Sequence, residues 1–342
     1  MRSRSRSRQP IVRQSGKIAN VIFSVTLLAL AAGILFFRQD IQDWMVLRNY
    51  QPNADIRQLA ERAALSAHGR HVFYVTQPEL HGKQSFSEKC RDVANDASSN
   101  VLGCYVAHRT YIFDVKDERL QGVREVTAAH EMLHAAYERL QGSERERVDG
   151  LIQKQLDTAV DEHIKELIIL YNRIEPGQLL NEMHSILATE QRTISPELED
   201  YYKRYFEDRA TVVGLSDDYR AVFDELKSRQ EQLVRDIESL ANRINDDTAE
   251  LNLAVTRFNK DVQDFNAAAA SGTMTQQEFA AERSALTARK DELARLRTAN
   301  DGLRAEYEAK QAEFESLAIE YKGLQEKVDS SLDATGDLTE VE

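Results

Sequence analysis

The chain is poor in the two residues that most often interrupt helices. It contains 14 glycines and 5 prolines in 342 residues, and no proline follows Pro196, so the last 146 residues have none. Sandwiches and barrels need many turns that are rich in glycine and proline. The scarcity therefore excludes an all-β fold for the C-terminal part and indicates long helices.

Cysteine is also scarce, because only Cys90 and Cys104 are present. Two cysteines exclude a disulfide-rich scaffold and a four-cysteine metal site. The segment between them is polar, and outside the cytoplasm a disulfide that closes it is expected to contribute about 3 kcal/mol through loop entropy. Two buried free thiols are the alternative.

Basic residues are outnumbered by acidic ones, and the net charge of −13 excludes a nucleic-acid-binding body. The exception is residues 1–17, which carry six Arg or Lys side chains and no acid. The remainder carries 38 basic against 57 acidic residues, a balance of −19. Residues 1–17 are therefore predicted to be a basic cytoplasmic tail.

Residues 18–37 contain no charged side chain. Twenty helical residues span about 30 Å, the hydrocarbon thickness of a bilayer, so we expect a transmembrane anchor that contacts lipid here. The basic tail predicts a single-pass protein of the cell membrane, with its N-terminus cytoplasmic and its catalytic part extracytoplasmic. A signal peptide cleaved near residues 29–31 is the alternative, but the apolar run continues to Phe37.

The part beyond the anchor is expected to begin with a stalk of one or two helices at residues 38–69. In residues 70–212, strand candidates come first and helices follow, which is typical of an α+β domain. The strands are expected at 71–76 and 105–115, and the helices at 123–140, 143–172, 178–191 and 196–206.

The last third has a heptad pattern of apolar residues from Leu226 to Val328, interrupted at Ser271-Gly272-Thr273. Two arms of about 54 residues on either side of a turn predict an antiparallel coiled-coil hairpin over residues 213–330, which could bind a protein partner. Pairing between two chains is the alternative. Residues 331–342 are acidic and are expected to be disordered.

The clearest chemical signal is the motif HExxH, formed by His130, Glu131 and His134 within an expected helix. Histidines at i and i+4 lie on one helix face with Cβ atoms about 5–6 Å apart, so both imidazoles can bind one zinc ion. Glu131 is rotated away from both and could take a proton from the water that attacks a carbonyl. A helix with two ordinary histidines, or a zincin that has lost activity, is the alternative.

This motif resembles that of the zincin metallopeptidases, and in particular that of the gluzincins, over roughly residues 70–210. The resemblance implies a zincin-like domain with one Zn2+ per chain, a third ligand from a later helix, and a protein or peptide substrate aligned on an upstream strand. Asn181-Glu182 with Ser185 three residues on resembles the third-ligand pattern, which makes Glu182 the expected ligand. The metzincin extension, a glycine and a third histidine after the motif, is absent.

Other residues compete for these roles. Glu190 is the main rival of Glu182, and it ends the same expected helix about 12 Å further on. Some gluzincins carry an acid four residues after the third ligand, but this position is Ile186, which leaves the residue that orients a histidine open. Glutamates expected on a solvated face are Glu162, Glu166 and Glu175. Candidates for stabilising an oxyanion are His184, Tyr171, Tyr201, Tyr202 and Tyr205, and His108 faces either the cleft or the solvent.

Together these patterns predict a membrane-anchored zinc metallopeptidase that hydrolyses peptide bonds outside the cytoplasm, with the water activated by Glu131. One alternative is a non-catalytic envelope scaffold that acts through its hairpin. Another is a zinc amidase or other hydrolase that acts on cell-wall material. Metal content separates the peptidase from the scaffold, and the choice of substrate separates the two hydrolases.

Overall fold

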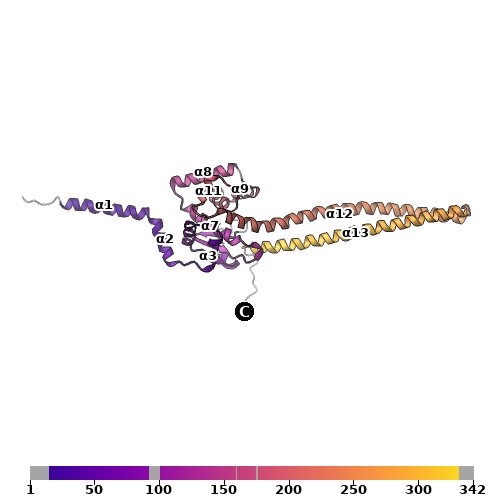
Figure 1. Ribbon diagram of the computed structural model, residues 1–342, viewed down its shortest axis with the longest axis horizontal. Helices are drawn as coiled ribbons and strands as arrows, with labels where there is room; N and C mark the ends of the chain where they lie inside the picture. Colours follow the sequence, from indigo (N-terminus) through magenta and orange to yellow (C-terminus); the bar gives the residue numbers. More distant parts are fainter. Residues whose placement is uncertain (1–14, 92–100, 159, 175, 331–342) are drawn as a thin grey trace, which may run out of the picture. The chain divides into compact units, whose positions relative to one another are not determined.

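The computed structural model describes residues 15–91, 101–158, 160–174 and 176–330, in which helices dominate (Figure 1). The chain forms two compact units. The first comprises Met1–Leu80, Gly103–Ile112 and Ala128–Arg209, and the second comprises His81–Leu102, Phe113–Thr127 and Ala210–Glu342. The predictions for residues 1–14 and 331–342 lie outside the described residues.

Helices make up most elements of the described chain. In order they are α1 (Ser15–Phe36), α2 (Arg38–Asn49), α3 (Ala54–Arg62), α4 (Ala67–Val75), α5 (Lys83–Lys89), α7 (Val123–Glu138), α8 (Gly142–Thr158), α9 (Glu162–Ile174), α10 (Leu179–Thr189), α11 (Pro196–Tyr202), α12 (Arg209–Ser271) and α13 (Gln276–Val328). Short 3-10 helices lie at Glu118–Leu120 and Pro176–Gln178. Side-chain caps explain several starts, since Ser66 and Ser195 accept a backbone N–H in the first turn of α4 and α11.

Three short strands, β1 (Glu79–His81), β2 (Gly103–Val106) and β3 (Arg109–Phe113), form a sheet in the order β1-β3-β2. Strands β2 and β3 are antiparallel, with Val106 paired to Arg109, so only Ala107 and His108 form the turn. Both turn residues have positive φ, 50° and 61°, as in a type I′ turn. Asparagine and glycine favour such a turn, so the backbone of this turn is strained.

We expect Ala107→Asn to raise the midpoint of thermal unfolding, by the equivalent of about 0.5–1 kcal/mol, because asparagine adopts positive φ more readily than alanine. Ala107 is exposed, so the new amide meets no packing conflict. Ala107→Val is the matched control and should lower the midpoint, since β-branched residues resist this conformation. Equal midpoints for all three proteins would show that the turn is not strained.

Helix α7 is a core helix with small residues on its packed side. Met132 and Leu133 are fully buried. Its buried alanines are Ala128, Ala129, Ala135 and Ala136. Small side chains let neighbouring elements approach closely, so the position of this helix is tightly constrained. The histidine-bearing face of α7 is therefore presented from a rigid support.

The expected α+β fold class is wrong, because the described chain is mostly helical and its sheet has only three short strands. Residues 71–76, expected as a strand, belong largely to α4, which begins at the Ser66 cap and buries Val72 and Phe73. Residues 143–172, expected as one helix, are divided between α8 and α9. Burial in the tertiary structure overrides the strand preference of the β-branched and aromatic side chains in α4.

The expected transmembrane anchor at residues 18–37 is also wrong. Among the helices of the described residues, none combines the length and the apolar character needed to cross a bilayer. The predicted single-pass location in the cell membrane, with an extracytoplasmic catalytic part, falls with this finding.

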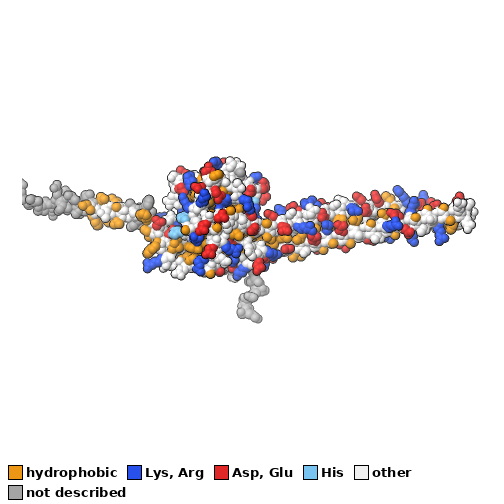
Figure 2. Space-filling model, in the orientation of Figure 1, with side chains coloured by type: hydrophobic (Ala, Val, Ile, Leu, Met, Phe, Trp, Pro, Cys, Tyr) orange, Lys and Arg blue, Asp and Glu red, His pale blue; other side chains and the backbone are white. Residues whose placement is uncertain are grey.

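The expected coiled-coil hairpin over residues 213–330 is likewise not shown. Helices α12 and α13 meet through individual side chains, such as the ring pair of Phe265 and Phe279 with centroids 5.1 Å apart. Among the expected seam residues, however, Phe279 and Leu296 are 38% and 46% exposed, whereas a coiled coil buries such positions. Figure 2 shows charged side chains of both signs along the surface of these two helices.

The predicted disulfide is confirmed. Neither cysteine of the chain is free, and Cys90 and Cys104 are bonded to each other. Cys90 directly follows α5, and Cys104 lies in β2.

Candidate metal centre

The three residues expected to bind zinc lie together in the first unit. His130 and His134, one turn apart on α7, have ring centroids 4.7 Å apart. Glu182 lies in the first turn of α10. Its Oε2 atom is 3.6 Å from Nε2 of His130, and its Oε1 atom is 3.6 Å from Nε2 of His134. All three side chains are mostly buried, with 11–18% of their surface exposed.

The donor set fits a zinc ion. One ligand atom from each of the three residues can be chosen so that all lie within 4.8 Å of one another. The histidine–glutamate separations of 3.6 Å are longer than an ordinary hydrogen bond. They are close to the separation of about 3.3 Å between neighbouring ligand atoms around a tetrahedral zinc with bonds of 2.0–2.1 Å. Two imidazoles and one carboxylate, with a fourth position left for water, are a common catalytic zinc set.

Asn181 orients one of the two imidazoles. Its Oδ1 atom lies 3.1 Å from Nδ1 of His134. An amide oxygen can only accept a hydrogen bond, so Nδ1 carries the proton and Nε2 keeps its lone pair toward the metal position. The sequence suggested position 186 for such a partner, but Ile186 is buried and apolar. The signal that was missed is the amide directly before Glu182.

Glu182 is held ionised although it is buried. Burial alone would raise the pKa of its carboxyl, but the charges of the neighbouring histidines and a hydrogen bond from Tyr171 lower that pKa to about 2. Burial raises the pKa of Tyr171 well above its usual range, so the phenol stays a donor. Glu182 therefore offers an ionised carboxylate, the form that binds a cation.

Glu131 faces the same region from α7 but has different surroundings. Its side chain is buried, at 5% exposure for the residue. Burial raises the pKa of its carboxyl to about 7, with His134 lowering it and the charge of Glu182 raising it. A carboxyl with a pKa near neutrality can both accept and return a proton, which is the requirement for a general base.

Helix α10 is fixed against α7 and α11 by His184, two residues after Glu182. The His184 ring is fully buried, its Nε2 atom lies 2.9 Å from the hydroxyl of Tyr201, and Tyr202 donates to its backbone oxygen. Its ring also packs on Tyr137 of α7, with centroids 5.2 Å apart. Burial lowers the pKa of His184 to about 3, so the ring is neutral. His184 therefore packs α10, the helix that carries Glu182, against its neighbours.

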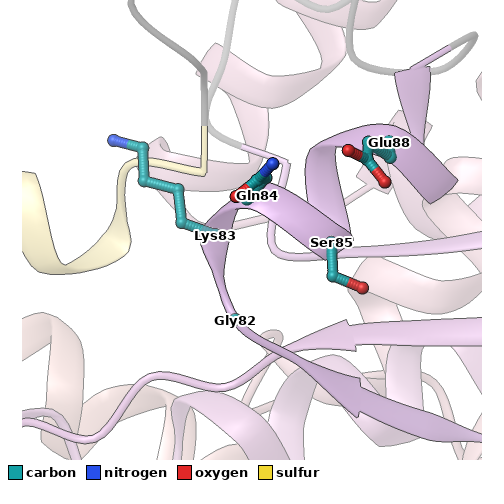
Figure 3. A pocket seen from close by; sticks show the side chains of 5 residues that line it. All are labelled: Gly82, Lys83, Gln84, Ser85 and Glu88. Carbon is teal, nitrogen blue, oxygen red and sulfur yellow. The ribbon is translucent and has the colours of Figure 1, made fainter. Parts of the chain in front are cut away.

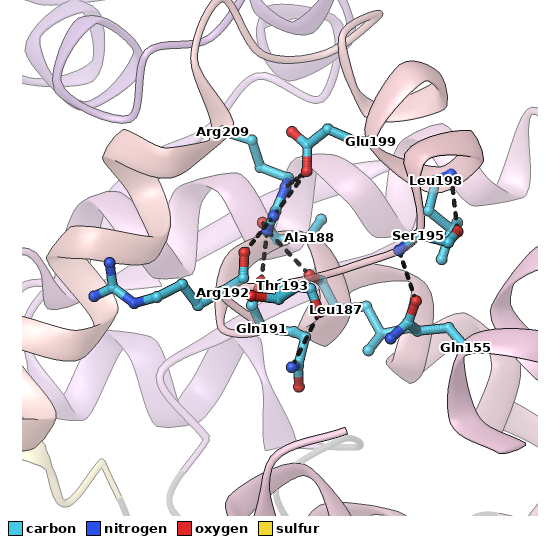
Figure 4. Close-up of polar contacts among 10 residues, drawn as sticks. All are labelled: Gln155, Leu187, Ala188, Gln191, Arg192, Thr193, Ser195, Leu198, Glu199 and Arg209. Atoms are coloured by element: carbon cyan, nitrogen blue, oxygen red, sulfur yellow. Dashed lines mark hydrogen bonds and ion pairs between the residues drawn. The ribbon is translucent and has the colours of Figure 1, made fainter. Parts of the chain in front are cut away.

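The other end of α10 is fixed by Arg209, whose side chain is only 5% exposed (Figure 4). Its guanidinium donates to the backbone oxygens of Gln191 and Arg192 at 2.7 and 3.0 Å and pairs with Glu199 at 2.9 Å. A cation at the C-terminal end of a helix also complements the helix dipole. Sequence reasoning did not single out Arg209, because its partners are backbone atoms brought together only by the fold.

The end of α7 is anchored through the next residue, Arg139. Its guanidinium donates to both carboxylate oxygens of the buried Asp43, at 2.7 and 3.0 Å, and His71 also contacts Asp43 at 3.0 Å. Burial raises the pKa of Asp43, but the bonds and charge of Arg139 outweigh this and lower it. Because α7 carries three site residues, this bidentate pair helps to hold the whole site in place.

The rival side chains are occupied elsewhere. Glu190 contacts Nε2 of His163 at 2.9 Å, and His108 is 78% exposed beside Glu138, so it faces solvent. Tyr201 and Tyr202 serve the His184 cluster, and Tyr205 lies 3.4 Å from the hydroxyl of Tyr201. Glu162 and Glu166 are exposed on α9, and Glu175 lies outside the described residues. Of the oxyanion candidates, Tyr171 is the one tied directly to the site, through Glu182.

A pocket lined by Gly82, Lys83, Gln84, Ser85 and Glu88 lies at the start of α5 (Figure 3). It contains none of the three candidate metal ligands. Helix α5 has only seven residues, and the pocket's polar groups show no ligand set. The three residues that could hold a metal ion, His130, His134 and Glu182, lie elsewhere and are referred to below as the metal cluster.

Comparison of the chain with protein-family models, with curated proteins and with solved structures gave no match. The metal cluster, with Glu131 beside it, is therefore the feature on which a functional conclusion depends.

Proposed function

We propose that the chain is a zinc-dependent hydrolase of the metallopeptidase type. The single observation that carries this proposal is the convergence of His130, His134 and Glu182 within 4.8 Å, beside a buried Glu131. The HExxH motif supports it independently, because the motif lies on a rigid helix with its histidines turned to the same carboxylate.

Each residue has a role that follows from its surroundings. Zinc bound by the metal cluster would supply Lewis acidity for the carbonyl and lower the pKa of a water molecule. Glu131 takes the proton from the attacking water as the C–O bond forms, and it returns a proton to the leaving nitrogen as the C–N bond breaks. Asn181 keeps His134 in the required tautomer, and Tyr171 holds one side of Glu182.

The substrate class, peptide bonds, follows from the resemblance to the gluzincins. In the sheet order β1-β3-β2, strand β2 lies at an edge, and an extended peptide could pair with such a strand. The hydroxyl of Tyr105 in β2 donates a hydrogen bond to Glu138 of α7, so this edge strand lies next to the helix that carries His130 and His134. This arrangement supports an extended peptide as the substrate.

The test is hydrolysis of unstructured protein substrates by the full chain before and after metal removal. We expect a zinc chelator to abolish hydrolysis, and equimolar zinc, but not magnesium, to restore it, because imidazole ligands favour zinc. Hydrolysis that survives complete metal removal would contradict the proposal. If the chain hydrolyses cell-wall amides but no peptides, and does so only with zinc, the amidase alternative replaces the peptidase proposal.

A further inference from the structure

Glu138, the last residue of α7, lies on the same helix face as the metal cluster. It follows His134 by four residues and His130 by eight, and four residues correspond to about 6 Å along a helix. The side chain of Glu138 is 50% exposed, whereas those of both histidines are mostly buried. Glu138 is therefore positioned at the rim of the proposed active site.

The carboxylate of Glu138 is held in place by the β2–β3 hairpin. The hydroxyl of Tyr105 donates to its Oε2 atom at 2.5 Å, and Nδ1 of His108 lies 3.2 Å from the same atom. His108 is a turn residue with positive φ, and the preceding Ala107 also has positive φ. Strained backbone of this kind is concentrated at functional sites, which supports a role for this hairpin tip.

The charge of Glu138 is not cancelled by the adjacent arginine. Arg139 donates both of its outer nitrogens to Asp43, so that pair is neutral as a whole. The side chain of His108 is 78% exposed, and Tyr105 is neutral because burial and Glu138 raise the pKa of its phenol above its usual range. Glu138 therefore presents a negative carboxylate to a peptide that lies along β2 and α7.

The geometry points to Glu138 as a specificity-determining residue, selecting peptide substrates with a lysine or arginine side chain near the scissile bond. This inference rests on the proposed function, since it needs a peptide to lie across the metal cluster. A basic side chain that reaches this rim meets a carboxylate already oriented by two partners, whereas an acidic side chain meets repulsion. At about 6 Å and an effective dielectric constant between those of water and protein, one such contact corresponds to about tenfold in kcat/KM.

The experiment measures kcat/KM of the full chain for a peptide series in which each position around the scissile bond is Lys, Ala or Glu in turn. We expect one position at which Lys exceeds Glu by at least about tenfold, with the difference shrinking as salt is added. Glu138→Gln should remove this preference, and Glu138→Lys should reverse it. Glu146→Gln, which changes an exposed glutamate on α8, should leave the preference as it is in the parent.

Two failures can be told apart. If the parent, Glu138→Gln and Glu138→Lys all cleave the peptides with the same charge preference, the assignment of Glu138 is wrong. The proposed hydrolase activity would then remain. Cleavage of no peptide by the zinc-loaded parent would overturn the proposed function, and the specificity role with it. A preference that Glu138→Lys reverses supports both.

Discussion

Glu131→Gln is expected to slow peptide hydrolysis by at least about 10²–10⁴-fold while one zinc per chain is retained. Glutamine keeps the size of the side chain and leaves the metal cluster intact, but it cannot accept the proton of the attacking water. The residue is buried at 5% exposure and has a pKa of about 7, so an uncharged replacement fits its surroundings. Thermal unfolding should therefore change little.

The matched control for this variant is Glu146→Gln, an exposed glutamate on α8 in the same unit. Its rate and zinc content should equal those of the parent. A Glu131→Gln protein that binds zinc and cleaves as fast as the parent would show that the proton acceptor is another group. Loss of zinc from this variant would show instead that Glu131 supports the metal cluster.

Glu182→Ala should lower zinc affinity by more than the roughly 10–100-fold typical of removing an outer partner of a metal ligand. The substitution removes one of three protein ligands and the only carboxylate that contacts both histidines among the described residues. Hydrolysis should fall in proportion to occupancy, and excess zinc should restore part of it.

Glu190→Ala is the matched control for the ligand, because this glutamate follows the last residue of the same helix and also contacts a histidine, His163. It should leave zinc affinity unchanged. A large loss of zinc in Glu190→Ala with normal binding in Glu182→Ala would transfer the ligand role to Glu190.

The local part of the site could be predicted from the sequence because its geometry is contained in one helix. Histidines four residues apart meet whenever the segment is helical, and α7 covers the expected segment. The pattern of Glu182 with Ser185 also made Glu182 the expected third ligand, with Glu190 as its main rival. The placement of α10 brings Glu182 to His130 and His134.

Three features of the fold differ from the expectation for physical reasons. Val72 and Phe73 favour a strand by propensity, but a cap at Ser66 and burial of both side chains make the segment helical. An uncharged run of twenty residues predicted the anchor, but no helix of the described residues has both the length and the apolar character needed to cross a bilayer. The heptad spacing predicted a coiled-coil seam, but spacing alone does not determine burial. Leu296, one of the expected seam residues, is 46% exposed.

Zinc binding is tested most directly by the zinc-to-protein ratio of the purified full chain, measured beside those of Glu182→Ala and Glu190→Ala. We expect one zinc per chain in the parent and in Glu190→Ala, and far less than one in Glu182→Ala. A parent chain that takes up no zinc, even when zinc is supplied in excess, would contradict the central claim that His130, His134 and Glu182 form a metal site.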